Sequence, residues 1–520
     1  MNVTGTSLFG IVVAMVAYLL AMLTIGFVAS RKNETVGDFY LGGRKLGPFV
    51  TAMSAEASDM SSWLLMGLPG LAYLSGIAEP VWTAIGLAVG TYINWLIVAK
   101  RLRRYSLAAD NAITIPEFFS NRFRDKAKIL TLVAALIIVI FFIPYTASGF
   151  AAIGKLFSSL FDVNYHLAMI VGAIVIIGYT MTGGFLAASF TDLVQSIIMT
   201  IALCIVLFFG INQAGGWDAV VSNAKTLAGQ LSLSMSHIPD ETNLFAPGST
   251  SPYGILTIIS TLAWGLGYFG MPHILLRFMA IEDENKLKLS RRIATIWVVI
   301  AMGVAILIGL IGLGMTKAGV VDALTTSGSS ETIIIQIAHR LSTFGFLPAL
   351  IAGLILSGIM ASTMSTADSQ LLAASSSVSQ DIFVTFFHVN LSEKSRIKVA
   401  RVSLFIIAVI AVFLAWNPDS SVFRIVSFAW AGFGAAFGPL VLFSLFWRRT
   451  NRYGALAGMI VGGAMIFIWK FLVRPLGGVL DIYELLPAFC ISAIAIVIVS
   501  LITPAPEKEV TDVFDQVAGR

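Results

Sequence analysis

The sequence predicts an all-α polytopic membrane protein with about 13 transmembrane helices, and three observations carry this prediction. The chain has 520 residues, of which 57% are hydrophobic and only 12% are charged, about half the charged share of an ordinary soluble protein. Its mean hydropathy is +0.89. Its apolar stretches run for roughly 20 residues, enough helix to cross about 30 Å of hydrocarbon, and they lack the alternation of a membrane β-barrel. Helices therefore satisfy the backbone hydrogen bonds in lipid.

Charged or Gly- and Pro-containing connections divide the chain into predicted spans. The first span has no basic segment before it and is longer than a signal-peptide core, so we expect it to be retained. We expect the connections 212–251 and 316–343, rich in Gly, Ser, Asn and Thr, to form external loops. The predicted spans are 8–29, 48–75, 81–99, 129–153, 167–182, 186–211, 252–276, 293–315, 344–375, 399–416, 421–446, 454–473 and 483–503.

The distribution of Lys and Arg indicates the orientation, because cytoplasmic loops carry an excess of both. With the amino terminus outside, all but seven of the 33 Lys and Arg residues fall in inner loops or the carboxyl-terminal tail. Arg277 is one of the residues assigned to an inner loop. We therefore expect an outer amino terminus and a cytoplasmic carboxyl terminus. The net charge of +5 then reflects topology, and no nucleic-acid partner is expected. The seven outer residues are Lys155, Lys225, Lys317, Arg340, Arg424, Lys470 and Arg474.

Several functional classes are disfavoured by the motifs in this chain. No P-loop ending in Lys-Ser or Lys-Thr is present, which argues against an ATP-driven pump. Gly265, Gly267 and Gly270 match G-x-G-x-x-G, but they lie in an apolar run without a preceding strand, so a dinucleotide site is not expected. Cys204 and Cys490 offer neither a disulfide framework nor a cysteine-rich metal site.

Two carboxylates lie inside the second span. Glu56 and Asp59 share the segment 54–63 with four serines, and a Gly-Leu-Pro-Gly string follows at 67–70. An Asp at the centre of a membrane helix costs about 2.5–3.5 kcal/mol on an insertion scale, so such residues usually face a watery cavity or a cation. The segment therefore predicts a functional polar site. The alternative is a structural hydrogen bond from Asp59 to freed backbone groups.

The seventh span carries three glycines and Pro272 within the segment 264–272. Glycine weakens a helix, and Pro272 removes a backbone donor and clashes with the preceding turn. Trp264 and Tyr268 are spaced i,i+4, so they lie on one face beside the expected break. We expect a broken helix with an aromatic wall. Ordinary aromatic packing beside a proline kink is the alternative.

The ninth span carries a stripe of hydroxyl groups. Ser362, Ser365 and Thr366 fall at i, i+3 and i+4, so their oxygens line one helix face. Hydroxyl and carbonyl oxygens are hard ligands that suit Na⁺ better than a thiophilic metal. Small residues in a span are also common helix-packing contacts, but their combination with the two polar breaks favours an ion site.

Breaks in the second and seventh spans predict a five-plus-five inverted-repeat (LeuT-like) core, which binds substrate and coupling ion near the midplane at helix ends and unwound carbonyls. Spans two to six would form one repeat, and spans seven to eleven the other. The expected regions are a first helix and cytoplasmic loop at 1–47, the first repeat with its outer loop at 48–251, the second repeat at 252–447, and two peripheral helices with a cytoplasmic tail at 448–520.

Colinear strings through nearly all of the membrane region resemble the sodium/solute symporter family, and in particular its bacterial proline-transporting members. The resemblance implies uptake of L-proline coupled to Na⁺ by alternating access in a bacterial cell membrane, with no organic cofactor and no obligatory protein partner. The strings are Leu-Gly-Gly-Arg at 41–44, Ala-Ser-Asp-Met-Ser at 57–61, Trp-Leu-Leu-Met-Gly-Leu-Pro-Gly at 63–70, Trp-Gly-Leu-Gly-Tyr-Phe-Gly at 264–270, Pro-His-Ile at 272–274 and Trp-Ala-Gly-Phe-Gly at 430–434.

The resemblance also implies site residues. Na⁺ would be held by the backbone carbonyls of Ala57, Met60 and Ser362 and by the hydroxyls of Ser365 and Thr366. Proline would lie between spans two, four and seven, near Ser58, Gly67, Tyr145, Trp264, Tyr268 and Pro272. Three residues would serve coupling: Asp59 by organising the sodium region, Asp192 on the inner ion path, and Arg44 in the first cytoplasmic loop. For Arg44, an ordinary positive-inside role is the alternative.

Four positions depart from the family pattern. Ser362 stands where alanine is usual, Glu56 and Ser62 stand where glycine is usual, and Met271 stands where a glutamine precedes Pro272. The change at Ser362 leaves the backbone carbonyl of this residue available as an ion ligand. The other three flank the expected pocket, where they could retune selectivity, or Glu56 could simply face a polar crevice.

Three other functions are open alternatives: a symporter of the same family for another small solute, a sodium channel, and a membrane-embedded enzyme. Saturable flux that needs both ligands would argue against a channel. The enzyme is disfavoured because no serine has a recognisable His/Asp partnership and because the histidines form no metal-ligand spacing. The histidines are His166, His237, His273, His339 and His388.

Overall fold

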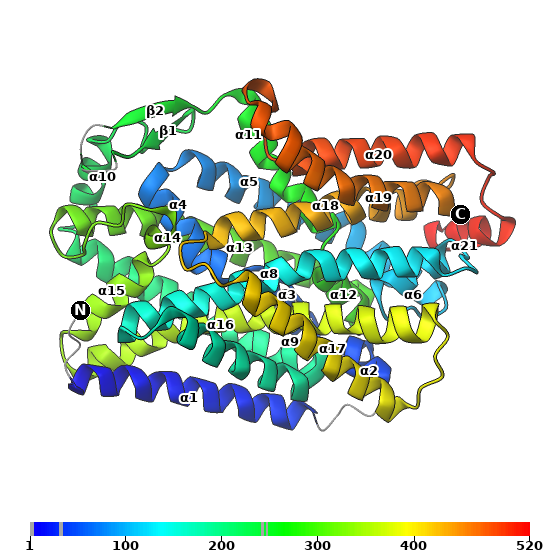
Figure 1. Cartoon of the computed structure of the whole chain (residues 1–520), viewed down its shortest axis with the longest axis horizontal. Coiled ribbons are helices and arrows are strands. Elements are labelled where there is room, and N and C mark those ends of the chain that lie inside the picture. Colours follow the sequence, from blue (N-terminus) through cyan, green and yellow to red (C-terminus); the bar gives the residue numbers. More distant parts are fainter. Residues whose placement is uncertain (1–4, 31–34, 241–243, 246–247, 520) are drawn as a thin grey trace.

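The computed structural model describes residues 5–30, 35–240, 244–245 and 248–519. These residues form a bundle of long helices that run roughly along one axis (Figure 1). Ten helices among them are long and apolar enough to cross a membrane, or up to eleven if the bent pair Ile255–Phe269 and Pro272–Ala280 is one span. The predicted all-α polytopic architecture is confirmed.

The predicted count of about 13 spans is not confirmed, and the difference lies in the broken and short helices. Within the predicted span 48–75, the apolar helix Trp63–Ser75 is too short to cross a membrane by itself, and so is Tyr165–Gly178 in the span 167–182. The spans predicted at 167–182 and 186–211 both lie in Tyr165–Gln213, where two helices meet at a kink marked by the non-helical backbone of Gly184 (φ 67°, ψ −176°).

The helices that build the bundle are α1 (Gly5–Ser30), α3 (Pro48–Asp59), α4 (Leu68–Ser75), α5 (Ala78–Ile93), α6 (Ala99–Ala108), α8 (Ile129–Phe161), α9 (Tyr165–Gln213), α11 (Ile255–Leu262), α12 (Pro272–Ala280), α13 (Leu287–Lys317), α16 (Phe346–Ser376), α17 (Glu393–Leu414), α18 (Val422–Phe446), α19 (Arg452–Ile468) and α20 (Leu485–Ile502). Smaller elements lie at its ends: α2 (Val36–Leu41), α7 (Ile115–Arg122), α10 (Trp217–Lys225), α14 (Ser327–Ser330), α15 (Ile333–Ser342), α21 (Lys508–Ala518), and the strands β1 (Met235–Ile238) and β2 (Ser249–Pro252). The two strands pair antiparallel, with Met235 opposite Pro252.

Short stretches of tighter or wider helix join these elements. The 3₁₀ segments are Gly42–Arg44, Ala263–Phe269, Glu284–Lys286, Arg474–Leu476 and Gly478–Leu480. The π-helical segments are Trp63–Gly67, Asn94–Val98, Ser377–Phe386 and Trp469–Val473. Such segments disturb the regular ladder of backbone hydrogen bonds and often lie at functional positions.

Both predicted helix breaks are present. In the second span, α3 ends at Asp59, Met60 leaves helical geometry (φ −76°, ψ 68°), and the chain continues into the π-helical segment at Trp63. In the seventh span, α11 passes into the 3₁₀ segment Ala263–Phe269, and α12 begins at Pro272 after a bend of 45°. Pro272 is tolerated as the first residue of a helix because that position needs no intrahelical N–H bond.

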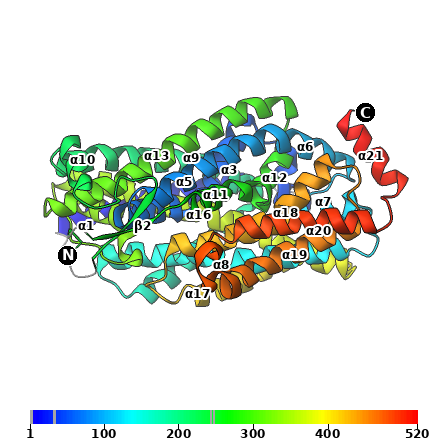
Figure 2. The same cartoon turned by 90° about the horizontal axis from the view of Figure 1, so that it is seen from above.

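Close backbone contacts hold the broken spans against their neighbours. A Cβ atom on Gly90 of α5 would lie 2.3 Å from the carbonyl oxygen of Gly265, so α5 packs directly against the 3₁₀ segment of the seventh span. The broken second span is also enclosed, because α3 packs against α9, α13 and α16. Figure 2 shows α18, α19 and α20 along one side of the bundle and α13 on the opposite side. The broken segments therefore lie in the interior of the protein.

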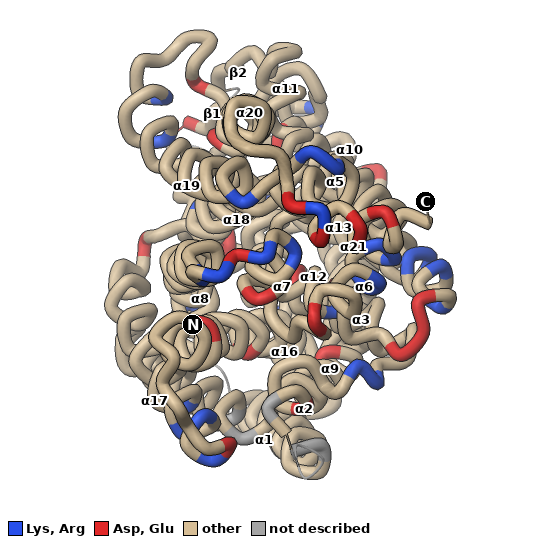
Figure 3. The backbone as a smooth tube through the Cα atoms, turned by 90° about the vertical axis from the view of Figure 1, so that its right-hand side faces the viewer, with Lys and Arg blue, Asp and Glu red and all other residues tan. Residues whose placement is uncertain are grey.

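The two ends of the bundle differ in their elements. One end carries the start of α1 with α10, α15 and the two strands, and the other carries α2, α6 and α21 (Figure 1). Figure 3 looks onto the second end, where Lys and Arg segments lie around α6 and α21. There Arg448 pairs with Asp515 of α21 at 2.8 Å.

Arg277 and Lys155, which the sequence assigned to loops, are buried inside helices next to the broken spans or the start of α18. Arg277 belongs to α12 and is 1% exposed, and Lys155 belongs to α8 and is 5% exposed. Both assignments were wrong because the helices continue several residues beyond the apolar runs. Both of these buried charges have an acidic partner, Asp192 for Arg277 and Glu331 for Lys155, which offsets the cost of burying an ion.

Candidate functional site

Oxygen atoms of α3 and α16 converge beside the end of α3. The hydroxyl of Ser365 lies 2.8 Å from the carbonyl oxygen of Ala57 and 3.3 Å from that of Ser362. The hydroxyl of Thr366 lies 3.5 Å and 3.2 Å from the same two oxygens. All four residues are buried. The structure thus brings together four of the five predicted sodium ligands.

The broken backbone explains why the carbonyl of Ala57 is available. In a continuous helix, this oxygen would accept from the N–H of Ser61. Here the Ser61 N–H donates to the carbonyl of Asp59 at 2.8 Å. The last carbonyls of a helix need other partners, and the α16 hydroxyls supply them. Met60, the fifth predicted ligand, is buried directly after α3, and none of these four contacts includes it.

Asp59 is the point at which three predicted residues meet. The hydroxyl of Tyr268 donates to its Oδ2 at 2.6 Å, and the hydroxyl of Tyr145 donates to its carbonyl oxygen at 3.4 Å. The indole of Trp63 also donates to that carbonyl, at 3.1 Å. Oδ1 of Asp59 is buried and has no hydrogen-bond partner. Asp59 thus joins α3, α8 and the broken seventh span.

Aromatic rings surround Trp264. Its ring centroid lies 5.3 Å from that of Phe423, 5.2 Å from that of Tyr483 and 6.3 Å from that of Trp63. The indole of Trp430 donates to the Trp264 carbonyl at 2.7 Å. These contacts fix the 3₁₀ segment against α18. The sequence predicted an aromatic wall of Trp264 and Tyr268 alone, and the rings that contact Trp264 extend this wall.

The other predicted substrate residues lie on the same broken spans. Gly67 ends the π-helical segment and faces Phe423, since a Cβ atom there would lie 3.0 Å from the Phe423 Cβ. Ser58 is buried in α3, and its hydroxyl donates to the Ala55 carbonyl at 3.0 Å. Pro272 is the buried first residue of α12. None of the described contacts joins Ser58 or Pro272 to the aromatic wall.

Asp192 lies in a buried polar cluster. Its Oδ2 accepts from the hydroxyl of Ser54 at 2.6 Å and pairs with the Arg277 guanidinium at 3.1 Å. Arg277 also donates to the hydroxyls of Ser54 and Ser369, at 3.0 and 2.6 Å. Ser54 lies one helical turn before Ala57 and Ser369 one turn after Ser365, so the cluster adjoins the oxygens described above.

Arg44 contacts neither Asp59 nor Asp192 but ties three segments at one end of the bundle together. Its guanidinium donates to the carbonyls of Met279 at 2.6 Å and Ala112 at 2.8 Å, and to the side chains of Asn111 at 3.0 Å and Ser106 at 3.1 Å. Burial and the nearby Arg103 lower the pKa of Arg44 to about 10. The guanidinium is therefore still charged at neutral pH.

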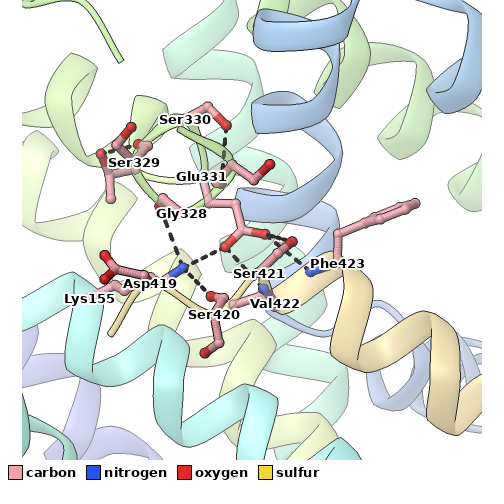
Figure 4. Close-up of polar contacts among 12 residues, drawn as sticks. Lys155, Gly328, Ser329, Ser330, Glu331, Asp419, Ser420, Ser421, Val422 and Phe423 are labelled. Atoms are coloured by element: carbon pink, nitrogen blue, oxygen red, sulfur yellow. Dashed lines mark hydrogen bonds and ion pairs between the residues drawn. The ribbon is translucent and has the colours of Figure 1, made fainter. Parts of the chain in front are cut away.

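A second buried ion pair lies near the start of α18 (Figure 4). Lys155 pairs with Glu331 at 2.7 Å and donates to the carbonyl of Ser420 at 2.7 Å. The same carboxylate accepts from the backbone N–H groups of Val422 and Phe423, each at 3.1 Å. Glu331 therefore satisfies the free donors at the N-terminus of α18 and helps to fix Phe423 beside Trp264.

Sequence reasoning missed several residues of this region. Arg277 carried no signal because a charge after an apolar run usually marks a loop. Asn94 did carry a signal in the sequence, since a polar residue inside the predicted span 81–99 is costly in lipid and marks a site. The partners Trp63, Phe423, Trp430 and Tyr483 are aromatic residues in apolar surroundings, which pattern alone cannot separate from ordinary packing.

Comparison with known proteins places this geometry in a family. The model of the sodium:solute symporter family matches residues 39–462. The sodium/proline symporter of Haemophilus influenzae is 44% identical over 502 residues, 96% of each chain. The osmoregulated proline transporter OpuE of Bacillus subtilis is 44% identical over 96% of each chain. The sodium/proline symporter of Escherichia coli K12 is 43% identical over 94% of this chain and 92% of its own.

Solved structures share the fold. A Na⁺-coupled sialic acid symporter in a substrate-bound, outward-open state aligns with a TM-score of 0.78 at 18% identity, over 96% of this chain and 99% of its own. Mhp1, a nucleobase-cation-symport-1 family transporter, aligns with a TM-score of 0.54 at 14% identity, over 92% and 98%. The family match covers most of the chain, and the relatives are similar along their whole length. This chain belongs to the sodium:solute symporter family.

Proposed function

We propose that this protein takes up L-proline together with Na⁺ by alternating access across a bacterial cell membrane, with its amino terminus outside and its carboxyl terminus in the cytoplasm. Relatives that are 43–44% identical carry the names sodium/proline symporter and proline transporter. The observation that carries the proposal is the meeting of α3 and α16 oxygens beside the break at Asp59.

The sodium ion would be held by the carbonyls of Ala57, Met60 and Ser362 and by the hydroxyls of Ser365 and Thr366. Two facts support this assignment. The four residues other than Met60 lie within 2.8 to 3.5 Å of one another through their oxygens. These oxygens are neutral and hard, which suits an alkali cation.

Proline would bind between the broken spans and α8, near Ser58, Gly67, Tyr145, Trp264, Tyr268 and Pro272. A small zwitterion with an apolar ring needs an aromatic wall for the ring and free N–H groups at a helix end for the carboxylate. The ring cluster around Trp264 supports the first requirement. The start of α12 at Pro272 supports the second.

Coupling would follow from bonds that join the two ligand regions. Asp59 adjoins the sodium oxygens through the backbone of α3 and holds Tyr268 of the proline region. Na⁺ bound beside α3 would order the broken segment and so favour the substrate-competent state, because a ligand shifts a conformational equilibrium by its differential affinity. Asp192 would lie on the inner path of the ion. Arg44 would hold the inner loops in their positions relative to one another.

The energetics are sufficient for concentrative uptake. One Na⁺ crossing a potential of about 100 mV yields about 2.3 kcal/mol, and a tenfold sodium gradient adds about 1.4 kcal/mol. The sum of about 3.7 kcal/mol would support a several-hundred-fold gradient of a net-neutral amino acid if one ion moves with each substrate.

Uptake of radiolabelled proline into proteoliposomes tests the proposal. With an inward Na⁺ gradient, we expect saturable accumulation above the outside concentration. The same gradient made with K⁺ or choline should give none. Proline uptake that is equally fast without Na⁺, or that never exceeds equilibration, would contradict the proposal.

A symporter of the same family for another small solute is the second candidate. Glu56 and Met271 favour it, because both are buried beside the expected pocket and both depart from the family pattern. Competition of Na⁺-driven proline uptake by other amino acids and organic acids distinguishes the two. Stronger inhibition by another solute than by unlabelled proline would favour the second candidate.

A further inference from the structure

Glu56 is a buried carboxylate without a counter-ion. Its side chain is 1% exposed; Oε1 accepts from the indole of Trp95 at 3.0 Å, and Oε2 has no hydrogen-bond partner. Among the described residues, no Lys or Arg pairs with Glu56. The nearby Arg277 pairs with Asp192 instead. A carboxylate in a protein interior is costly unless a proton or a cation neutralises it.

Residues of the neighbouring elements carry further buried oxygen atoms without a hydrogen-bond partner. Asn94 follows α5 and donates through its amide nitrogen to the Tyr268 carbonyl at 3.0 Å, which leaves its amide oxygen buried and unpartnered. Thr91 lies one turn earlier, on the same face as Asn94, and its buried hydroxyl is also unpartnered. Tyr268 binds Oδ2 of Asp59, whose Oδ1 is free.

These contacts form a closed network. Trp95 ties the segment after α5 to Glu56, the adjacent Asn94 ties it to Tyr268, and Tyr268 returns to Asp59, three residues after Glu56 on α3. Residues at i and i+3 share a helix face. The residues that carry the free oxygens therefore belong to one buried network between α3, α5 and the 3₁₀ segment of the seventh span.

The backbone keeps this region compact. Gly86 and Gly90 of α5 approach the seventh span so closely that a Cβ atom on Gly86 would lie 2.5 Å from the Leu262 carbonyl oxygen. A Cβ on Gly90 would lie 2.3 Å from the Gly265 oxygen. The element that carries Thr91 and Asn94 thus cannot move away from Tyr268 without losing this packing. The backbone segments that carry Thr91, Asn94 and Tyr268 are therefore held together by the fold.

We propose that Glu56 Oε2, Asp59 Oδ1, Asn94 Oδ1 and the Thr91 hydroxyl bind a second Na⁺. All four ligands are oxygen atoms, which hard alkali cations prefer. Each buried acceptor without a partner costs free energy, and one cation would satisfy these oxygens while neutralising Glu56. Divalent ions are disfavoured, because they favour more carboxylates, or water, than this dry region offers.

The second site is distinct from the sodium site proposed beside α16. The carbonyl of Ala57 faces Ser365 of α16, whereas the side chain of the preceding Glu56 faces Trp95 on the other side of α3. Asp59 lies between the two. This inference rests on the proposed Na⁺-coupled transport, and it makes the transport ratio two Na⁺ per proline.

The ratio can be measured without assumptions about rate. Proteoliposomes are loaded with radiolabelled proline at a fixed gradient, the voltage is set by K⁺ and valinomycin, and the outside Na⁺ is varied until net flux is zero. The reversal point gives the number of Na⁺ ions moved per proline. We expect two for the wild type and one for Glu56→Gln, which keeps the side-chain size and removes the charge. Trp95→Phe is the matched control, because it removes the donor to Oε1 but leaves the four ligands, and it should retain two.

Binding of ²²Na⁺ to purified protein provides a second readout. We expect two ions per wild-type molecule and one for Glu56→Gln. If Glu56→Gln does not fold, Glu56→Gly, which carries the residue usual in the family, should also bind one.

Four results would overturn the site: a wild-type ratio of one, an unchanged ratio in both Glu56 variants, a reversal point that follows the pH gradient instead of Na⁺, or loss of one ion from Trp95→Phe. Flux that ignores Na⁺ altogether would overturn the proposed function and the second site with it. A wild-type ratio of one with intact Na⁺-driven uptake would overturn the second site alone.

Discussion

The hydroxyl of Tyr268 donates a 2.6 Å hydrogen bond to Oδ2 of Asp59, and this bond joins the broken segments of the second and seventh spans. Both side chains are almost fully buried. A hydrogen bond to a charged group contributes about 1.5–3 kcal/mol, more than one between neutral groups. A rearrangement of either broken span must therefore carry the other with it or break this bond.

Replacing Asp59 by Asn should weaken the response of transport to sodium. The amide keeps the size of the side chain but loses its charge, so the Na⁺ concentration for half-maximal proline uptake should rise about tenfold or more, equivalent to about 1.4 kcal/mol. Tyr268→Phe is the matched control for the hydrogen bond alone and should give a smaller rise. A wild-type Na⁺ response in Asp59→Asn would remove Asp59 from the ion site.

Thr366→Ala should raise the half-maximal Na⁺ concentration about tenfold, because it removes one oxygen ligand of roughly hydrogen-bond strength, about 1 kcal/mol. Thr363 offers a control on the same helix. Its hydroxyl donates to the Ile359 carbonyl within α16 at 2.9 Å and contacts no residue of α3 in the described network. Thr363→Ala should leave the Na⁺ response near wild type, and equal effects of both substitutions would count against the hydroxyl face.

Trp264→Ala should raise the KM for proline more than the half-maximal Na⁺ concentration. The indole contributes its apolar face to the ring cluster, and truncation of a large buried aromatic residue costs about 3–5 kcal/mol, part of it in local packing. Measuring both constants on the same preparation separates substrate binding from ion binding. Trp217→Ala, at a 44% exposed tryptophan of α10, controls for loss of a tryptophan. Equal shifts in both constants would place Trp264 outside the proline site.

The sequence could predict the parts of this site that break the rules of an apolar helix. Asp59, Pro272 and the hydroxyls of Ser365 and Thr366 are each costly or unusual inside a span, so their positions were readable. Their mutual contacts were not, because residues such as Asp59 and Tyr268 are 209 positions apart in the chain and only packing brings them together.

The helix ends were the least readable part of the fold. An apolar run in the sequence marks the part of a helix that contacts lipid. Where other parts of the protein cover the last turns of a helix, those turns can carry polar residues, so the helix continues beyond the end of the apolar run. Arg277 shows the effect, since α12 continues to Ala280 and buries the guanidinium against Asp192. For the same reason the sequence assigned Asp192 to an ion path but could not supply its counter-ion.

The Asp192–Arg277 pair should respond to single and double substitution in different ways. Arg277→Met leaves Asp192 as an unpaired buried charge, which costs about 3–5 kcal/mol, so the thermal midpoint of the purified protein should fall markedly. The double variant Arg277→Met with Asp192→Asn removes both charges and should recover most of that loss, because neither side chain is then left as an unpaired buried charge.

The surface pair Arg448–Asp515 provides the matched comparison for this cycle. Arg448 is 52% exposed at its side chain, and exposed pairs contribute only about 0–1 kcal/mol, so Arg448→Met should change the midpoint little. Coupling between the two substitutions at the buried pair should therefore be large and at the surface pair small. A double variant at Asp192 and Arg277 that is as unstable as the sum of its single variants would show that the two side chains act independently. Arg277 would then stabilise the protein through Ser54 and Ser369 instead of through Asp192.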